Sequence, residues 1–423
     1  MFKLFLKDSF AYFVTKALVS LTWVAIVFVF TKFLTPEEYS SYSVVMIFCQ
    51  LISVSVNSWI AAGLLRYYPT YETQRESFTQ TVKFLSLVSL GLVFLSTLVG
   101  LLLLVKFHIV SNSKYLLIIA VALTVMMSVY QLIVTKFRIQ RKLKMVFSIN
   151  AAQPILGFAL ACMFLWLDSG VVGIFLGYLL SYSIFIFLID FSRNGSLFNY
   201  NKAIASKILS YGIPIFFINL FMQLLMYSDQ FILKFYGLHY EAGLYAANYS
   251  IAEKSIYSIS VVISSALVPI IYSAWERGEE ATVIRLVKKV FFLFVVGALP
   301  LLIIFILFHY NLSSLIVGKA FVSGHVIVPY VSLGAFFLGC SNIISEMLTI
   351  KEKTKLLMIC YLIAALFNII FNFIFIPWYG MIGASIVTMC SYLILLIATT
   401  YQVNRQIPLS HFFKTNINGK DSR

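Results

Sequence analysis

Two segments of the chain, GVVGIFLGYLLSY at residues 170–182 and GMIGASIVTMCSY at residues 380–392, carry the same pattern. Each begins with G-x-x-G and ends with Ser-Tyr, where the serine comes eight residues after the second glycine. One copy lies in each half of the chain. The fold is therefore expected to consist of two related halves.

The chain is too apolar for a soluble protein. Of its 423 residues, 61% are hydrophobic and 11% are charged, whereas soluble domains have roughly 45–50% apolar and about 25% charged residues. Apolar runs recur along the chain, and each is long enough to cross the roughly 30 Å hydrocarbon layer of a bilayer. Strand-like alternation is absent, so the sequence predicts an all-α polytopic membrane protein.

Charged residues, glycines and prolines divide these runs into about twelve transmembrane (TM) helices. The predicted spans are 10–31, 41–65, 84–105, 115–135, 146–167 and 171–189, then 209–235, 243–273, 290–308, 326–349, 357–376 and 381–401. We expect a six-helix bundle within residues 1–200. A second six-helix bundle and a short cytoplasmic tail are expected within residues 201–423.

Lysine and arginine are distributed unequally among the predicted loops. With the N-terminus in the cytoplasm, most of them fall on the cytoplasmic side, and the other side keeps only Lys32, Lys106, Lys114, Lys234 and Lys319. This bias predicts that both termini are cytoplasmic. Topology thus accounts for the formal net charge of +15, and no continuous basic stripe suggests binding to nucleic acid.

Two further pairs of segments support the duplication. LTPEEYSSYS at 34–43 resembles LHYEAGLYAA at 238–247, and the basic loop RKLKM at 141–145 corresponds to KEKTKL at 351–356. Both halves are predicted to start and end on the same side. They are therefore parallel repeats, related by a pseudo-two-fold axis along the membrane normal.

Longer segments resemble a known family. They are LTPEEYSSYSVV from residue 34, SYGIPIFFINL from residue 210, YSDQFILKFYGLHYEAGLYAANYSIAEK from residue 227 and IPWYGMIGASIVTMCSYL from residue 376. Together they resemble the polysaccharide transporters of the multidrug/oligosaccharidyl-lipid/polysaccharide (MOP) superfamily, and within it the Wzx-type O-antigen repeat-unit flippases. The resemblance covers nearly the whole chain.

The resemblance implies a fold and an activity. Two bundles would surround a central cavity that opens alternately to each side of the bacterial inner membrane. The substrate would be an undecaprenyl-pyrophosphate-linked oligosaccharide that moves from the cytoplasmic to the periplasmic leaflet. Besides this substrate and membrane lipids, polymerase and chain-length proteins of the same pathway are candidate partners.

Two alternatives stay open at this stage. A cation-coupled multidrug exporter of the same superfamily would have a similar span count. A non-transporting membrane subunit of polysaccharide synthesis would share the composition but would not need charged residues inside its spans. Altered drug sensitivity would favour the first, and tolerance of substitutions at intramembrane charges would favour the second.

Motifs of catalysis and metal binding are missing from the sequence. It contains neither a Walker A pattern nor H-E-x-x-H, so we do not expect an enzyme. The five cysteines, Cys49, Cys162, Cys340, Cys360 and Cys390, are scattered and suggest neither a metal site nor a disulfide framework. No cofactor is predicted, although H⁺ or Na⁺ is a candidate coupling ion.

Cationic side chains within spans are candidates for binding a pyrophosphate headgroup, because an anion in the membrane needs donors that replace its hydration. The candidates are Lys16, Arg66 and Lys254. Lys16 could instead extend to the cytoplasmic interface, and Arg66 could be a topological anchor. Lys254 lies far from both ends of its span.

Polar and acidic residues around the seventh and eighth spans complete the prediction. Tyr245, Asn248 and Tyr249 could contact sugars, although a tyrosine in a span is more often a packing residue. Asp229 and Glu253 are candidate coupling or cavity residues, and a structural role is the alternative for Asp229. Glu253 and Lys254 are adjacent, so their side chains should diverge and are not expected to pair.

Overall fold

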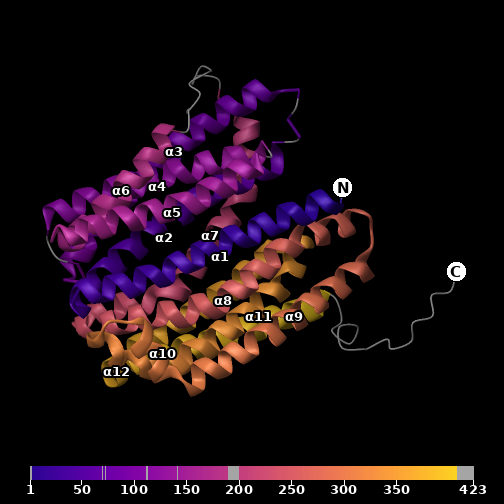
Figure 1. The fold of residues 1–423 in the computed structure, drawn as a ribbon. Helices are drawn as coiled ribbons and strands as arrows, with labels where there is room; N and C mark the ends of the chain where they lie inside the picture. The colour runs from indigo at the N-terminus through magenta and orange to yellow at the C-terminus, as the bar shows by residue number, and fades with distance from the viewer. Residues whose placement is uncertain are drawn as a thin grey trace, which may run out of the picture.

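The structure is a computed structural model, and it describes residues 2–68, 70–71, 73–110, 113–140, 142–188 and 200–406; for residues 2–17, 143 and 265–269 it describes the backbone alone. The helices, drawn in Figure 1, are α1 (Phe2–Phe33), α2 (Pro36–Tyr67), α3 (Arg75–Lys106), α4 (Lys114–Ile139), α5 (Leu143–Trp166), α6 (Gly170–Leu188), α7 (Lys202–Phe235), α8 (His239–Glu276), α9 (Glu280–Leu307), α10 (His309–Ile316), the 3₁₀ helix η1 (Lys319–Ile327), α11 (Val328–Ile350) and α12 (Thr354–Gln406). By length and apolar composition of the described residues, nine helices qualify as membrane spans; this count takes α12 as one helix and does not include α1 and α8.

The start of α2 shows how local sequence ends one helix and begins the next. Thr35 accepts a hydrogen bond from the backbone N–H of Glu38, and the Glu38 carboxylate accepts one from the backbone N–H of Thr35. This capping box is followed by Pro36 at the first helical position, where a missing N–H costs nothing. The turn between α1 and α2 is therefore encoded by the residues LTPEE.

The G-x-x-G motifs mark the same structural position in the two halves. Gly170 begins α6 with φ +54°, and Gly380 interrupts α12 with φ +52°. A side chain at Gly380 would also collide with the Glu241 carboxylate, which accepts a hydrogen bond from the backbone N–H of Met381 at 2.8 Å. α12 thus contains two helices that meet at Gly380, and they correspond to the predicted spans 357–376 and 381–401.

With this break taken into account, the described chain has the twelve long helices that the sequence predicts. The all-α polytopic fold is confirmed. Residues 309–327 add two short elements that counting spans does not reveal, α10 and η1, which are too short to cross a membrane. Phe321 of η1 is fully buried and its carbonyl accepts a hydrogen bond from Asn248 of α8 at 3.0 Å.

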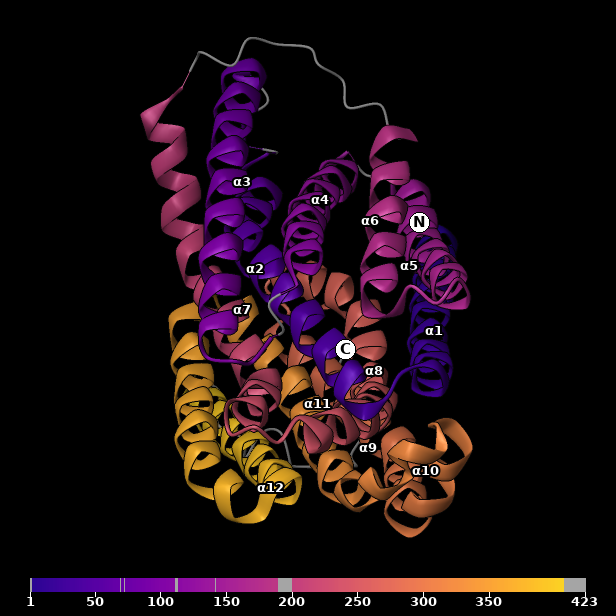
Figure 2. The same ribbon diagram turned by 90° about the vertical axis from the view of Figure 1, so that its left-hand side faces the viewer.

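The helices gather in two groups (Figures 1 and 2): α2 to α6, with α1 packed on α5, form the first, and α8 to α12 form the second. α7 lies between them and packs against both α2 and α12. Side chains at Gly63 and Gly212 would clash with Ile208 and the backbone of Trp59, so α2 and α7 approach closely. Because α7 contacts both groups, the domain boundary predicted at residue 200 stays a prediction.

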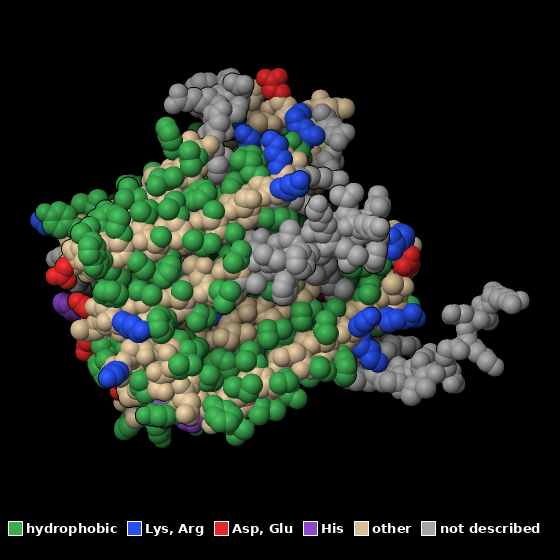
Figure 3. Space-filling model, in the orientation of Figure 1, with side chains coloured by type: hydrophobic (Ala, Val, Ile, Leu, Met, Phe, Trp, Pro, Cys, Tyr) green, Lys and Arg blue, Asp and Glu red, His purple; other side chains and the backbone are tan. Residues whose placement is uncertain are grey.

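The two ends of the bundle differ in their residues. We call the end where α1 begins the basic end; Arg66, Arg277 and Lys351 lie there. The opposite end carries the turn at Thr35 between α1 and α2 and the turn at Gly237 between α7 and α8. Between these ends, hydrophobic side chains are spread over the face seen in Figure 3, as expected for a surface in contact with lipid.

Candidate functional site

Backbone contacts close the opposite end of the molecule. A side chain at Gly243 would overlap the carbonyl oxygen of Pro36, so α8 touches the start of α2. The backbone N–H of Gly318 donates a hydrogen bond to the hydroxyl of Thr31 at 2.9 Å. These contacts join the two groups of helices at this end in the present conformation.

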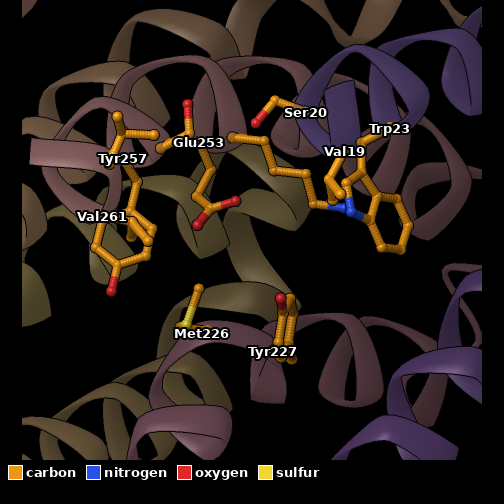
Figure 4. A pocket seen from close by; sticks show the side chains of 11 residues that line it. Val19, Ser20, Trp23, Met226, Tyr227, Glu253, Tyr257 and Val261 are labelled. Carbon is orange, nitrogen blue, oxygen red and sulfur yellow. The ribbon is translucent and has the colours of Figure 1, made fainter. Parts of the chain in front are cut away.

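A cavity of about 230 Å³ lies between α1, α7 and α8, near the middle of α1 and α8 (Figure 4). Its walls are formed by Val19, Ser20, Trp23, Met226, Tyr227, Glu253, Lys254, Tyr257, Ser258, Val261 and Val262. Aromatic rings and short aliphatic side chains dominate the lining. Lys254 and Glu253 are its only ionisable groups apart from the tyrosines, among the residues that the structure describes.

The ammonium group of Lys254 rests on an aromatic face. Its Nζ lies 3.5 Å from the ring centroid of Trp23 in α1. No carboxylate of the described chain lies within ion-pair distance of it. A cation–π contact of this kind stabilises the charge without using the hydrogen-bond donors, so Lys254 can still bind an anion.

Glu253 brings a second charge to the same cavity. The residue is only 2% exposed, and its side chain has no hydrogen-bond partner within the described residues. Figure 4 shows its carboxylate directed into the space bordered by Met226 and Tyr257. No ion pair connects it to Lys254, as expected for adjacent helical residues.

A second, smaller cavity of about 40 Å³ continues from the first. Trp23, Tyr227 and Lys254 line both cavities. The smaller cavity extends toward the opposite end, where Ser43 and Gln230 line it. The two cavities follow the contact between the helix groups, the place where a duplicated transporter is expected to bind its substrate.

Asp229 occupies a buried polar network beside this path. It is fully buried and accepts hydrogen bonds from the hydroxyl of Tyr245, from Thr388 Oγ1 at 3.1 Å and from the backbone N–H of Gln230 at 2.8 Å. Asn368 donates to Thr388 at 3.2 Å. Carboxylate, amide and hydroxyl oxygens are the ligands that hard cations prefer, so this network is a candidate ion site.

Tyr245, Asn248 and Tyr249 lie outside both cavities. Tyr245 is bonded to Asp229, and the hydroxyls of Tyr249 and Tyr392 are 2.7 Å apart. Asn248 holds α8 to η1 and accepts a hydrogen bond from Ser313 at 2.7 Å. In this conformation all three have partners within the protein, and their predicted contact with sugars stays a prediction.

The other predicted cations lie apart from the cavity. Arg66 forms an ion pair with Glu352 at 2.6 Å at the basic end, where the two side chains are 47% and 63% exposed. Lys16 falls within α1, and its side chain lies outside the described residues. The structure therefore brings together Lys254 and Glu253 among the predicted site residues, with Asp229 close to their path.

Trp23 is the site residue that sequence reasoning missed. It lies in an uninterrupted apolar run, and nothing in its spacing separates it from the other four tryptophans. Metal binding by clustered side chains gains no support, since no group of three or more His, Cys, Asp or Glu residues occurs in the described part of the chain. All five cysteines are free.

Comparisons with known proteins identify a family for the sequence and similar solved structures for the fold. A family model described as "Polysaccharide biosynthesis protein" matches residues 29–329. An uncharacterized membrane protein of Methanocaldococcus jannaschii is 28% identical over 143 residues, which is 34% of this chain. The aligned part spans 28% of that curated relative.

Solved structures with a similar fold include transporters of two kinds. The MATE multidrug transporter DinF-BH has a TM-score of 0.73 and 15% identity, covering 97% of this chain and 96% of that one. The lipid II flippase MurJ in an inward closed conformation has a TM-score of 0.70 and 19% identity, with 96% and 89% covered. An inward-facing MATE family transporter of the MOP superfamily has a TM-score of 0.70 and 14% identity, with 96% of each chain covered.

Proposed function

This chain belongs to the polysaccharide biosynthesis protein family, and we propose that it is a flippase for a lipid-linked oligosaccharide. The proposed substrate is an undecaprenyl-pyrophosphate-linked repeat unit of O-antigen or a related surface polysaccharide. It would move from the cytoplasmic to the periplasmic leaflet of a bacterial inner membrane. In this orientation the basic end and both termini are cytoplasmic, and the opposite end faces the periplasm.

The observation that carries the proposal is the cavity between α1 and α8. It holds an ammonium group, Lys254, that forms no ion pair with a carboxylate of the described chain. A diphosphate loses its hydration when it enters the membrane, and a charge-assisted hydrogen bond from an ammonium replaces part of that loss. Trp23 and Tyr227 offer ring faces for a sugar beside it.

The size of the cavity suggests how much of the substrate it holds. At about 230 Å³ it is smaller than the roughly 300–1,000 Å³ of pockets that enclose a drug-sized ligand. It therefore fits a part of the headgroup, while the polyprenyl chain stays in lipid. An inside-negative potential favours outward movement of the diphosphate by about 2.3 kcal/mol per charge for each 100 mV.

Coupling to a cation is a second element of the proposal. The Asp229 carboxylate and the Thr388 hydroxyl meet in a buried network, in which Asn368 donates to Thr388 through its amide nitrogen and accepts from Ser228 and Asn372 through its oxygen. Asn372 Oδ1 nearby has no hydrogen-bond partner in the described structure. A carboxylate surrounded by hydroxyl and amide groups suits Na⁺ or a proton better than a phosphate, which the carboxylate would repel. Binding of the ion would bias the packing of α7 against α12, and through α7 the contact between the two helix groups.

A deletion strain tests the proposed function. Cells without the protein should accumulate lipid-linked repeat units in the inner leaflet and lose surface polysaccharide, and the wild-type chain should restore both. Drug sensitivity serves as the comparison, because a multidrug exporter predicts altered sensitivity with intact glycan display. Normal arrival of the lipid-linked glycan in the periplasmic leaflet of the deletion strain would refute the flippase.

A further inference from the structure

A line of polar side chains joins α2 and α7 between the smaller cavity and the opposite end. Ser43 of α2 donates a hydrogen bond to Gln230 of α7 at 2.8 Å. One helical turn further along α7, Lys234 donates to the hydroxyl of Ser41 at 3.0 Å. We call these four residues the polar seam; they connect α2 to α7 at the end of the smaller cavity, which Ser43 and Gln230 line.

Lys234 is unusual within the polar seam because it is a buried cation with a weak partner. The residue is 3% exposed, and no carboxylate of the described chain forms an ion pair with it. Its ammonium has three donors, yet within the described residues it forms a single hydrogen bond, to the neutral hydroxyl of Ser41. A buried charge without a counter-ion lowers stability, so packing alone does not explain a lysine here.

Other lysines at the opposite end are placed differently. Lys319 and Lys32 are exposed, as expected for loop lysines near a membrane interface. Lys234 instead is buried and donates to Ser41 of α2. Gln230 lines the smaller cavity together with Lys254, and Lys234 lies one helical turn beyond Gln230 on α7, on the same side of that helix.

Opening of the opposite end would change the surroundings of Lys234, which is buried in this conformation. Separation of α2 from the end of α7 breaks its bond to Ser41 and exposes the ammonium to a water-filled cavity. An uncovered lysine on that side attracts anions. In the present conformation the same group is covered, whereas Lys254 already lines a cavity.

We propose that Lys234 is a second anion-binding group on the transport path, covered by the polar seam in this conformation and exposed to a phosphate-bearing headgroup when the opposite end opens. The proposal rests on the flippase function proposed above. Lys254 would receive the headgroup at the central cavity, and Lys234 would receive it on the exit side. The serines and Gln230 would close the seam again after release.

Cysteine labelling tests this placement directly. A Ser43→Cys chain is treated with an impermeant thiol reagent in sealed vesicles whose opposite end faces the reagent, with the parent chain as the blank. We expect labelling, and we expect inorganic pyrophosphate to slow it about tenfold by binding at an ammonium. The slowing should disappear when Lys234→Met is added and persist when Lys319→Met is added.

The outcomes separate this inference from the general function. Absence of labelling, or equal slowing with and without Lys234→Met, overturns the role of Lys234. Neither result depends on a glycan. The labelling experiment can therefore refute the role of Lys234 while the deletion strain still supports the flippase, and the deletion strain can refute the flippase while the labelling result stands.

Translocation by the Lys234 variants gives an independent measurement. Lys234→Met should fold at least as well as the wild type, because methionine removes a buried charge and keeps much of the volume. We expect it to translocate the lipid-linked glycan about tenfold more slowly, with Lys234→Arg close to the wild type. Wild-type translocation by Lys234→Met at equal membrane abundance would refute the proposal.

Discussion

Replacing Lys254 by methionine removes the one ammonium group of the central cavity and leaves most of the side-chain volume in place. Lys254 is partly buried, and its Nζ lies 3.5 Å from the centroid of Trp23. The methionine side chain would still pack on the indole through its apolar atoms, so we expect normal folding and membrane abundance. The change therefore isolates the charge.

The expected magnitude follows from the surroundings of the ammonium. At about 4 Å and an effective dielectric constant of about 20, two unit charges attract each other by about 4 kcal/mol. Part of this gain is offset, since Lys254 leaves a contact with Trp23 worth about 0.5–2 kcal/mol and is partly exposed to screening. A net loss of about 1.5–3 kcal/mol, as for hydrogen bonds to charged groups, corresponds to translocation slower by about 10- to 150-fold.

The assay measures how fast the lipid-linked glycan appears in the periplasmic leaflet at equal protein abundance. Lys32→Met is the matched control, because Lys32 Nζ lies 3.6 Å from the ring centroid of Phe28, yet it is exposed and outside both cavities. It should translocate normally, and Lys254→Arg should retain a large part of the activity. If Lys254→Met and Lys32→Met behave alike, the reasoning about the cavity charge is wrong.

Three further predictions concern other parts of the molecule. Gly243→Ala should destabilise the present conformation by about 1–3 kcal/mol, because a Cβ there overlaps Pro36. Gly297→Ala has open space around it within α9, so it should leave the melting temperature unchanged or raise it slightly in a thermal unfolding assay. If Arg66 binds the headgroup, Arg66→Gln should slow translocation more than Glu352→Gln does. If the two residues form only an exposed ion pair, both variants should translocate alike and each should lose at most about 1 kcal/mol of stability. Asp229→Asn should abolish any rise in melting temperature that Na⁺ produces in the wild type, and an unchanged rise would exclude Asp229 as an ion ligand.

Much of the fold was accessible from sequence because the bilayer imposes a length on every span. The matching glycines at 170 and 380 predicted the duplication, and both begin a helix with positive φ. The family resemblance is confirmed at the level of the polysaccharide biosynthesis protein family, whose model matches residues 29–329. α10 and η1 escaped prediction, because short helices that pack on other helices have no span-length signal.

The site was predicted less completely than the fold. Lys254 and Glu253 were identifiable because ionisable residues inside a span are costly and need a reason. Lys234 was counted with the loop lysines, since its place near the end of a span is the usual place for an interfacial anchor. Trp23 and Gln230 depend on which helix faces come together, and that information lies in the packing of α1, α2, α7 and α8.

Reconstitution in liposomes tests the central claim most directly. The purified chain is incorporated into vesicles with a polyprenyl-diphosphate-linked oligosaccharide, and the fraction of glycan reached by an impermeant lectin is followed over time. The flippase predicts that the inner pool becomes accessible with the wild-type chain and about 10- to 150-fold more slowly with Lys254→Met. A pool that stays as inaccessible as in protein-free vesicles would contradict the account.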